Sequence, residues 1–247
     1  MVVSFIHAIA FLTVFPVPDR FYEKHPLPNI QTTLFFPFIG LLIGAIFSLC
    51  AFAIHAHVPP YPLSILAIFA LAAVSGFLHL DGLADSADGF FSSRPKDRIL
   101  EIMKDSRIGS MGAVILFFTL MMKVSALAVL YPSRTDFCIA LFLMPFAGRC
   151  FLVIGMYLQP YAREEGLGKC MWNDKPLVSF IAIVLFSVVI LFFFKIKMAF
   201  LILMIFLFFC YAYSKYCKKK IGGATGDTLG AGCELSETLI VFILCLV

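Results

Sequence analysis

The chain has 247 residues, of which 62% are hydrophobic and only 14% are charged, and its mean hydropathy is +0.99. A soluble domain carries about 25% charged residues, so this composition excludes an ordinary soluble protein. The net charge of +4 is small, and Lys and Arg stand between apolar runs rather than in a basic stripe, which argues against nucleic-acid binding. The predicted surroundings of most of the surface are lipid.

Continuous apolar runs predict membrane-spanning helices rather than the short alternating strands of a barrel. Six runs approach the length of about 20 helical residues that a hydrocarbon core requires, and these are 33–56, 63–80, 111–130, 137–158, 177–194 and 198–213. The terminal runs 3–15 and 235–247 are shorter, and at about 1.5 Å per residue neither crosses upright. We predict an all-α fold: a polytopic integral membrane helical bundle of six spanning helices and two short terminal apolar helices, forming a single domain over 1–247.

The connections 81–110, 159–176 and 214–234 carry most of the 19 Lys and Arg residues. Cytoplasmic connections of membrane proteins collect these residues, so we expect a multi-pass protein of the cell (cytoplasmic or inner) membrane with these connections in the cytoplasm. The short links expected outside are 57–62, 131–136 and 195–197. Every carboxylate except Asp136 is expected on the cytoplasmic side, which predicts an active site there.

An acidic motif, LHLDGLADSADGFF, occupies positions 78–91 and places Asp81, Asp85 and Asp88 at the spacing i, i+4 and i+7. At about 100° per residue, a helix brings these side chains into a sector of roughly 60° on one face. Carboxylates so close repel one another unless a cation neutralises them, and hard oxygen ligands suit Mg²⁺ or Mn²⁺. The motif predicts a metal site, the alternative being a solvated acidic helix end.

Two cationic residues, Lys123 and Arg149, stand inside predicted spans, where a charge is costly and marks a candidate functional residue. Of the two, Arg149, beside Gly148, is the stronger functional candidate, and we expect Lys123 either to pair with a carboxylate or to line a cavity. His79 lies on the opposite side of an ideal helix from Asp81. It is therefore either a hydrogen-bonded interface residue or a catalytic base or ligand.

The segment EIMKDSRIGSMG at 101–112 alternates charge directly before a predicted span, at Lys104, Asp105 and Arg107. Cations beside a carboxylate are typical of a phosphate and metal site, where Lys and Arg neutralise phosphate charge. We therefore expect this segment, with Lys104, Asp105 and Arg107, to contribute to a phosphate and metal site. The alternative is a charged turn at the membrane surface.

A glycine-rich segment, KKKIGGATGDTLGAGCE, occupies 218–234. Its glycines allow backbone amides to approach a phosphate, Thr225 offers a hydroxyl and Asp227 a carboxylate for a metal. The segment lacks the spacing of a P-loop or of GxGxxG, so a flexible connector with a basic flank at the membrane surface is an equal alternative.

Six pieces of the sequence resemble one known family. They are FLTVFPVP at 11–18, FFPFIGLLIG at 35–44, FLHLDGLADSADGF at 77–90, EIMKDSRIGSMG at 101–112, the GR pair at 148–149 and GGATGDTLGA at 222–231. They run nearly end to end. On these motifs the chain resembles the cobalamin synthases, the adenosylcobinamide-GDP ribazoletransferases of corrinoid assembly.

The resemblance implies an integral membrane transferase that depends on Mg²⁺, with Mn²⁺ as the alternative metal. In the implied reaction a ribose hydroxyl of α-ribazole, or of its 5′-phosphate, attacks the corrinoid-bearing phosphate of adenosylcobinamide-GDP, and GMP is released. The implied partners are the corrinoid nucleotide, α-ribazole and the lipid bilayer, with no nucleic acid. Assembly as a homo-oligomer, or with other corrinoid-assembly enzymes, is a further expectation.

This interpretation assigns roles to the candidate residues. The metal ligands are Asp81, Asp85, Asp88 and Asp105, and the catalytic candidates are Asp105 and His79. The substrate-binding residues are Lys104, Arg107 and Arg149, with Thr225 and Asp227 closing the site from the third segment.

Two other functions are alternatives. A CDP-alcohol phosphotransferase also has an aspartate-rich motif at a membrane margin, but its pattern begins DGxxAR, whereas Asp85 and Ser86 follow DGLA here. A transporter for a divalent cation or an organic anion usually binds its substrate near the bilayer midplane. The crowding of carboxylates at one margin favours the enzyme.

Overall fold

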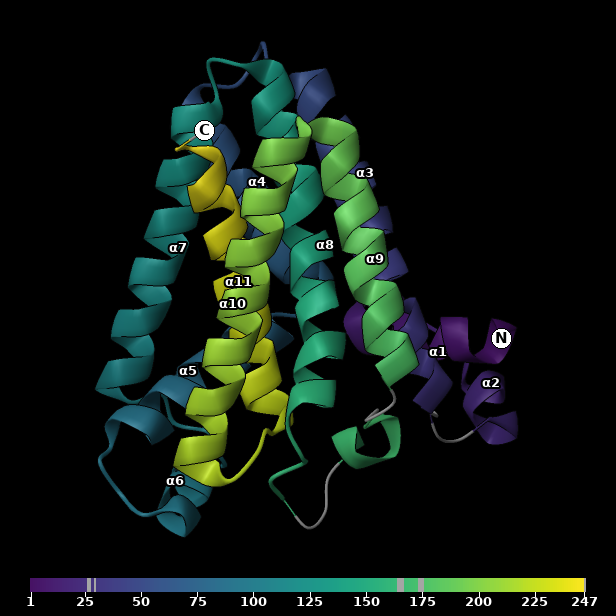
Figure 1. Ribbon diagram of the computed structural model, residues 1–247, viewed down its shortest axis with the longest axis vertical. Coiled ribbons are helices and arrows are strands. Elements are labelled where there is room, and N and C mark those ends of the chain that lie inside the picture. Colours follow the sequence, from purple (N-terminus) through teal and green to yellow (C-terminus); the bar gives the residue numbers. More distant parts are fainter. Residues whose placement is uncertain (26–27, 29, 164–166, 173–175, 247) are drawn as a thin grey trace.

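The computed structural model describes residues 1–25, 28, 30–163, 167–172 and 176–246. All regular elements in this part of the chain are helical, which confirms the predicted all-α membrane bundle (Figure 1). The long helices are α3 (Phe36–Ile54), α4 (Pro60–Val74), α5 (Leu78–Phe91), α7 (Ser110–Leu130), α8 (Arg134–Leu158), α9 (Pro176–Phe193), α10 (Ile196–Ile221) and α11 (Gly226–Leu244). The short elements are α1 (Val2–Leu12), α2 (Asp19–Lys24), η1 (Ile30–Phe35), α6 (Lys96–Ile102) and η2 (Leu167–Met171).

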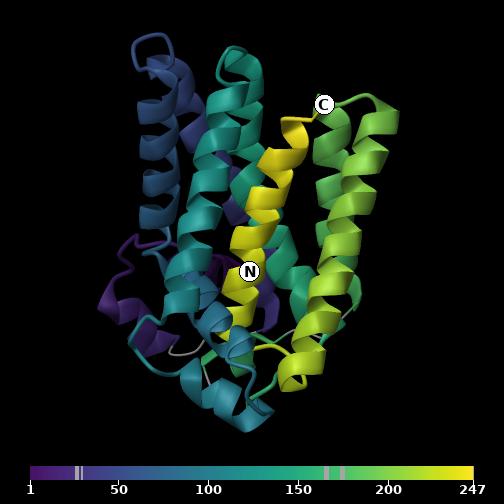
Figure 2. The same cartoon turned by 90° about the vertical axis from the view of Figure 1, so that its left-hand side faces the viewer.

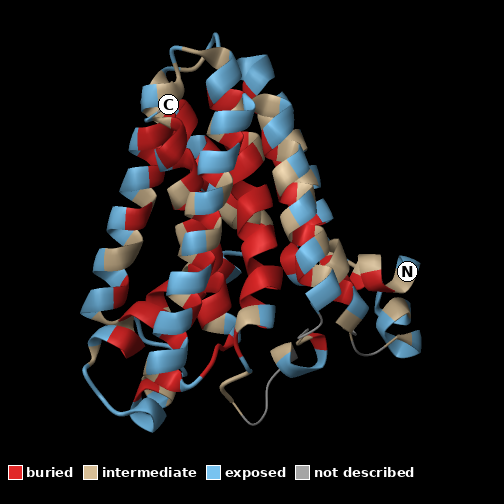
Figure 3. Ribbon diagram, viewed as in Figure 1, coloured by how far each residue is buried: buried red, intermediate tan, exposed pale blue. Residues whose placement is uncertain are grey.

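Five helical segments among the described residues are long and apolar enough to cross a membrane, and a sixth is added if α4 and α5 count as one broken span. Helix α8 forms the centre of the bundle, because 89% of its span is buried, compared with 22% for α9 and for α10. Figure 3 shows exposed residues recurring along the outer helices α9 and α10, whereas α8 is buried over most of its length. These exposed residues are mostly Phe, Leu, Ile and Val, as expected of a surface in contact with lipid.

Small residues let the helices pack closely on α8. A Cβ atom at Gly40 of α3 would lie 2.8 Å from the carbonyl oxygen of Pro145. A Cβ atom at Gly232 of α11 would overlap the ring of Phe151. Small residues at such interfaces are typical of membrane helices, since association in lipid depends on close van der Waals contact.

The run 63–80 is not one straight helix, so that prediction was wrong. Helix α4 ends at Val74, and α5 leaves it at an angle of 91°. The chain turns through Gly76 and Phe77, both with a φ of 61°, a backbone conformation that Phe adopts only at a steric cost. As a result, α5 lies across one end of the bundle instead of continuing the span (Figure 1).

The last helix begins earlier than the apolar pattern indicates. The segment 214–234 was predicted as a cytoplasmic connection, but α10 continues to Ile221 and α11 starts at Gly226. Helix α11 packs between α5, α7 and α8, and most of its residues are buried. Its 19 residues extend about 28 Å at 1.5 Å per residue, so it is a buried helix of nearly spanning length and not a short terminal one.

The long connections gather at one end of the bundle. The segments around α5, α6 and the start of α7 lie together with the end of α8, η2 and the link between α10 and α11 (Figures 1 and 2). The links from α3 to α4, α7 to α8 and α9 to α10 lie at the opposite end. The grouping of the connections therefore agrees with the pattern of Lys and Arg, although parts of 159–176 lie outside the described residues.

Candidate active site

Helix α5 presents its aspartates at the end of the bundle where the long connections meet. Asp81 is exposed, and Asp85 and Asp88 are partly buried. Burial, followed by the negative charges of Asp81, Asp227 and Asp88, raises the pKa of Asp85 to about 7. The carboxylates of α5 are therefore close enough to act on one another, and a fourth from α11 joins them. A cation at this cluster would remove the repulsion that disfavours the ionised form.

Asp88 also holds the start of α7. Its Oδ2 accepts the N–H of Gly109 at 2.7 Å, and its Oδ1 accepts the N–H of Gly112 at 2.8 Å. These N–H groups lie at the start of α7, where backbone N–H groups have no acceptor within the helix. A Cβ atom at Gly112 would lie 2.5 Å from Asp88 Oδ2, so this approach requires glycine. Asp88 thereby ties the segment 101–112 to the acidic face.

The N-terminus of α11 brings Asp227 to the α5 aspartates. A Cβ atom at Gly82 would lie 2.9 Å from the Cα of Asp227, so only a small residue on α5 allows this approach. The first turn of α11 is closed by a capping box, in which the Thr225 hydroxyl accepts the Thr228 N–H and the Thr228 hydroxyl accepts the Thr225 N–H. Thr225 is fully buried and donates to Asp227 Oδ2 at 3.3 Å, so its hydroxyl positions Asp227.

A cation that the sequence pattern did not single out completes this group. Arg163 Nη2 lies 2.7 Å from Asp227 Oδ2, with the two side chains 19% and 25% exposed. Arg163 follows a parallel bridge in which Ala162 N–H donates to Ala224 O at 2.8 Å and Ala224 N–H donates to Pro160 O at 2.9 Å. The bridge joins the end of α8 to the start of α11, and it places Arg163 at the acidic cluster.

A cavity of about 320 Å³ opens beside these residues. Its polar lining includes Asp81, Asp227 and Arg163, and its apolar lining comes from α1, α3, α8 and η2. This volume is at the lower end of the range for small-molecule sites. The carboxylates therefore stand at the edge of a space that accepts a ligand.

His79 lines the same cavity. The residue is 3% exposed, and its Nε2 has no hydrogen-bond partner among the described residues. A Cβ atom at Gly230 would lie 3.3 Å from the Cα of His79, so the ring packs against α11. A buried imidazole nitrogen without a partner is costly, which distinguishes His79 from a satisfied interface residue.

The segment with Lys104, Asp105 and Arg107 is exposed and makes its own local pairs. Arg107 donates to Asp105 from Nε at 3.0 Å and from Nη2 at 2.7 Å. These bonds lower the pKa of Asp105 to about 2. A carboxylate with so low a pKa is a weak proton acceptor at neutral pH, so this geometry does not favour Asp105 as the general base. None of the three lines the cavity as described.

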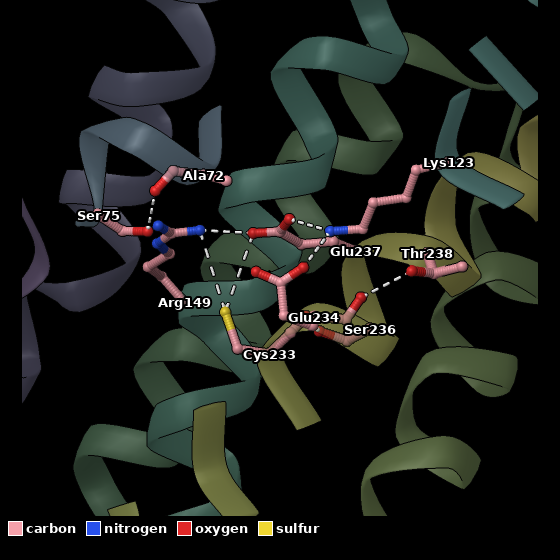
Figure 4. Close-up of polar contacts among 9 residues, drawn as sticks. All are labelled: Ala72, Ser75, Lys123, Arg149, Cys233, Glu234, Ser236, Glu237 and Thr238. Atoms are coloured by element: carbon pink, nitrogen blue, oxygen red, sulfur yellow. Dashed lines mark hydrogen bonds and ion pairs between the residues drawn. The ribbon is translucent and has the colours of Figure 1, made fainter. Parts of the chain in front are cut away.

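Arg149 is not among the residues that line the cavity; it belongs to a buried charge cluster formed by Lys123, Arg149, Glu234 and Glu237 (Figure 4). Lys123 Nζ lies 2.6 Å from Glu234 and 2.7 Å from Glu237, and Arg149 Nη1 lies 2.5 Å from Glu237. The pairing of Lys123 with carboxylates is therefore confirmed. The expectation that Glu234 and Glu237 lie on the cytoplasmic side was wrong, because both are buried in the bundle.

The donor set of the acidic cluster suits a hard divalent cation, since it consists of carboxylate oxygens. Asp88 caps the start of α7, so the carboxylates that remain for a cation are those of Asp81, Asp85 and Asp227. No group of three or more His, Cys, Asp or Glu side chains within the described ranges is already arranged as a coordination shell. The carboxylate oxygens and their negative charge therefore suit a divalent cation, although the side chains are not yet arranged as a complete coordination shell.

Comparison with known proteins agrees with the family resemblance of the sequence motifs. The family model described as Cobalamin-5-phosphate synthase matches residues 4–245. The adenosylcobinamide-GDP ribazoletransferase of Klebsiella pneumoniae strain 342 is 36% identical over 245 residues, covering 99% of this chain and 100% of that protein. The protein of the same name from Citrobacter koseri is 34% identical over 243 residues, covering 96% of each chain. No solved structure matches the chain at a significant level. By its full-length match, the chain belongs to the Cobalamin-5-phosphate synthase family.

Proposed function

We propose that the protein is an adenosylcobinamide-GDP ribazoletransferase that joins α-ribazole, or its 5′-phosphate, to the corrinoid with release of GMP. Family membership supports the class of enzyme. The observation that carries the mechanism is the meeting of Asp81, Asp85 and Asp227 with Arg163 at the mouth of a cavity. Displacement at a diphosphate needs this combination of metal-binding oxygens and cationic charge.

In this proposal Asp81, Asp85 and Asp227 hold Mg²⁺, or Mn²⁺, which supplies charge neutralisation at the phosphates. Arg163 lies beside Asp227 and binds a phosphate oxygen, with Lys104 and Arg107 approaching from the exposed segment. Asp88 fixes the start of α7 against α5. Arg149 acts as a structural partner of Glu237.

The reaction forms one bond and breaks one bond at the same phosphorus. A ribose hydroxyl oxygen bonds to the phosphorus that carries the corrinoid, and the bond from that phosphorus to the bridging oxygen breaks, so that this oxygen leaves with GMP. The hydroxyl proton passes to solvent water at the exposed end of the site, because Asp81 and Asp227, which line the cavity, are assigned to the metal in this proposal.

We also propose that the protein lies in the inner membrane and that its active site faces the cytoplasm. The support is the gathering of the basic connections at the end of the bundle that holds the acidic cluster. Cytoplasmic connections collect Lys and Arg, and a water-soluble nucleotide meets the site on that side.

The test is GMP release by the purified protein in liposomes, given adenosylcobinamide-GDP and α-ribazole phosphate with Mg²⁺ or with chelator. We expect release that requires metal, and loss of at least about 100-fold in the Asp81→Ala and Asp85→Ala variants, the scale found when one electrostatic contact to a transition state is removed. Asp97→Ala, on exposed α6, is the matched control. Full activity in a correctly inserted double variant, or substrate uptake into sealed vesicles without GMP release, would refute the proposal.

A further inference from the structure

The cavity has two chemically different ends. Its polar end holds Asp81, Asp227 and Arg163, which the proposed reaction uses. The remaining wall is mostly apolar and comes from separate elements, with Phe36 of α3, Met156 of α8, Met171 of η2 and Trp172 directly after it. The chemistry at the phosphates does not need this apolar wall, so it points to a second part of a ligand.

We propose that this cavity is the binding site for the nucleoside acceptor, with an apolar benzimidazole base against the wall and the ribose at the carboxylates. This inference rests on the proposed function, and it places α-ribazole, one of the two substrates, in the cavity. A flat apolar base attached to a polyhydroxyl sugar has the same division into apolar and polar parts as the cavity. The attacking hydroxyl then stands beside Asp81 and Asp227.

The aromatic residues at the open side fit a flat ring. Trp172 and Tyr161 both line the cavity and form an edge-to-face pair with ring centroids 5.0 Å apart. Aromatic side chains provide large apolar contact area at little conformational cost. A planar base entering between this pair and Met156 is held by contacts that need no hydrogen bond.

His79 supplies a polar contact within this mostly apolar wall, to which Tyr161 and Trp172 also bring a hydroxyl and an indole N–H. A benzimidazole joined to ribose has one free ring nitrogen, which is an acceptor, and a ring N–H of His79 donates to it. His79 lines the cavity, and its Nε2 has no partner among the described residues; Nε2 is itself covered, so the imidazole ring turns about its Cβ–Cγ bond to present an N–H to the ligand. Guanine, by contrast, presents several donors and acceptors along its edge and needs several buried polar partners.

The size of the cavity favours the nucleoside over the corrinoid. About 320 Å³ is the space of a small ligand, whereas sites for large cofactors extend toward 1,000 Å³ and beyond. The corrinoid part of the other substrate therefore lies outside this cavity, and its phosphates meet the acceptor at the polar mouth.

Trp172 provides a direct measurement, since it is the single tryptophan of the chain. Its fluorescence is followed in the full-length protein in detergent, with chelator present, while α-ribazole without any phosphate is added. We expect a saturable change, and no change with GMP over the same range. A saturable change with GMP that α-ribazole reverses by competition would overturn the assignment, because the cavity would then hold the donor nucleotide.

Two pairs of variants test the same point by kinetics. His79→Phe removes the donor and should raise the KM for α-ribazole about three- to tenfold, which corresponds to the loss of one hydrogen bond. His79→Gln retains a donor, so its KM for α-ribazole should lie between those of the wild type and His79→Phe. Gly226 lines the cavity, and a Cβ atom there meets no atom within 4 Å, so we expect Gly226→Leu to narrow the cavity, with Gly226→Ala as its small control. The KM for adenosylcobinamide-GDP should stay within about twofold in both pairs, since a contact that the donor does not make adds nothing to its binding.

The outcomes separate this inference from the proposed function. Normal turnover with an unchanged KM for α-ribazole in His79→Phe and Gly226→Leu would overturn the cavity assignment alone. If the wild-type protein releases no GMP but still binds α-ribazole at Trp172, the proposed reaction fails and the cavity assignment stands. A rise in the KM for the donor instead of the acceptor would also overturn the assignment.

Discussion

Lys123 of α7 donates to Glu237 of α11 at 2.7 Å across 114 residues of sequence. Arg149 of α8 donates to the other oxygen of the same carboxylate at 2.5 Å. Glu237 therefore joins three helices at one point inside the bundle, and the second carboxylate, Glu234, balances the remaining charge. Since α11 carries Asp227 in its first turn, the ion pairs in the middle of the helix also fix the position of α11 along its axis relative to the active site.

Removing one member of the cluster should destabilise the protein. Lys123→Met leaves two carboxylates buried beside a single cation, Arg149. Breaking a buried ion pair by removing one partner costs about 3 kcal/mol or more, because the uncompensated charge stays buried. Unfolding by SDS in mixed micelles should show this loss in the free energy of unfolding.

The double variant Lys123→Met with Glu234→Gln is the control, because it removes one charge of each sign. We expect it to recover at least about half of the lost stability, as coupled partners do not behave additively. Equal instability of the single and double variants would show that Lys123 contributes by packing and not by charge.

Asp88→Ala should loosen the start of α7. The variant removes the acceptor for the N–H groups of Gly109 and Gly112, at a cost of about 1–2 kcal/mol by comparison with other helix caps. Amide hydrogen exchange should rise at residues 109–112, and Asp88→Asn, which retains one acceptor oxygen, should show a smaller increase. Unchanged exchange in Asp88→Ala would contradict the capping role.

Arg163→Gln should impair turnover with little effect on stability. The Arg163 and Asp227 side chains are partly exposed, and ion pairs of that kind contribute about 1 kcal/mol or less to folding. A charged hydrogen bond to phosphate is stronger, so kcat/KM should fall about 10- to 100-fold. Arg163→Lys keeps the charge and should recover part of the activity. Full activity in Arg163→Gln would exclude a role at the phosphates.

Asp105→Ala distinguishes a local ion pair from a catalytic group. Asp105 contacts Arg107 at an exposed position, so its loss should change the melting temperature little. If Asp105 serves only to order Arg107, kcat/KM should fall no more than about tenfold, and Asp105→Asn should recover most of it. A loss of 1,000-fold or more in both variants would identify Asp105 as a metal ligand or base.

The class of fold and the acidic face were predictable because they depend on local sequence. Apolar runs indicate membrane helices, and the spacing of Asp81, Asp85 and Asp88 follows from one helical period. The sequence indicated that the motifs of Asp85 and Asp227 have related chemistry, but it did not show that the two residues lie close together. Their contact depends on the packing of Gly82 against α11.

Other features depend on contacts between distant segments. Arg163 resembles any cytoplasmic cation in the sequence, and its place at Asp227 follows from the bridge between Tyr161 and Ala224. Glu234 interrupts the apolar pattern of α11, so the last apolar run was predicted to start after it, at 235, with Glu237 inside the run. Their burial is possible only because Lys123 and Arg149 neutralise them, which is a property of three helices together.

The bend after Val74 also determines where water meets lipid beside the site. Helix α4 has 15 residues and reaches about 22 Å, less than the hydrocarbon thickness of about 30 Å. Local thinning of the bilayer is one way in which a span that is too short is accommodated. If α4 crosses the membrane, we expect lipid headgroups to be drawn inward around α5, which would leave the aspartates in a recess of the membrane surface. A charged nucleotide would then reach them without entering hydrocarbon.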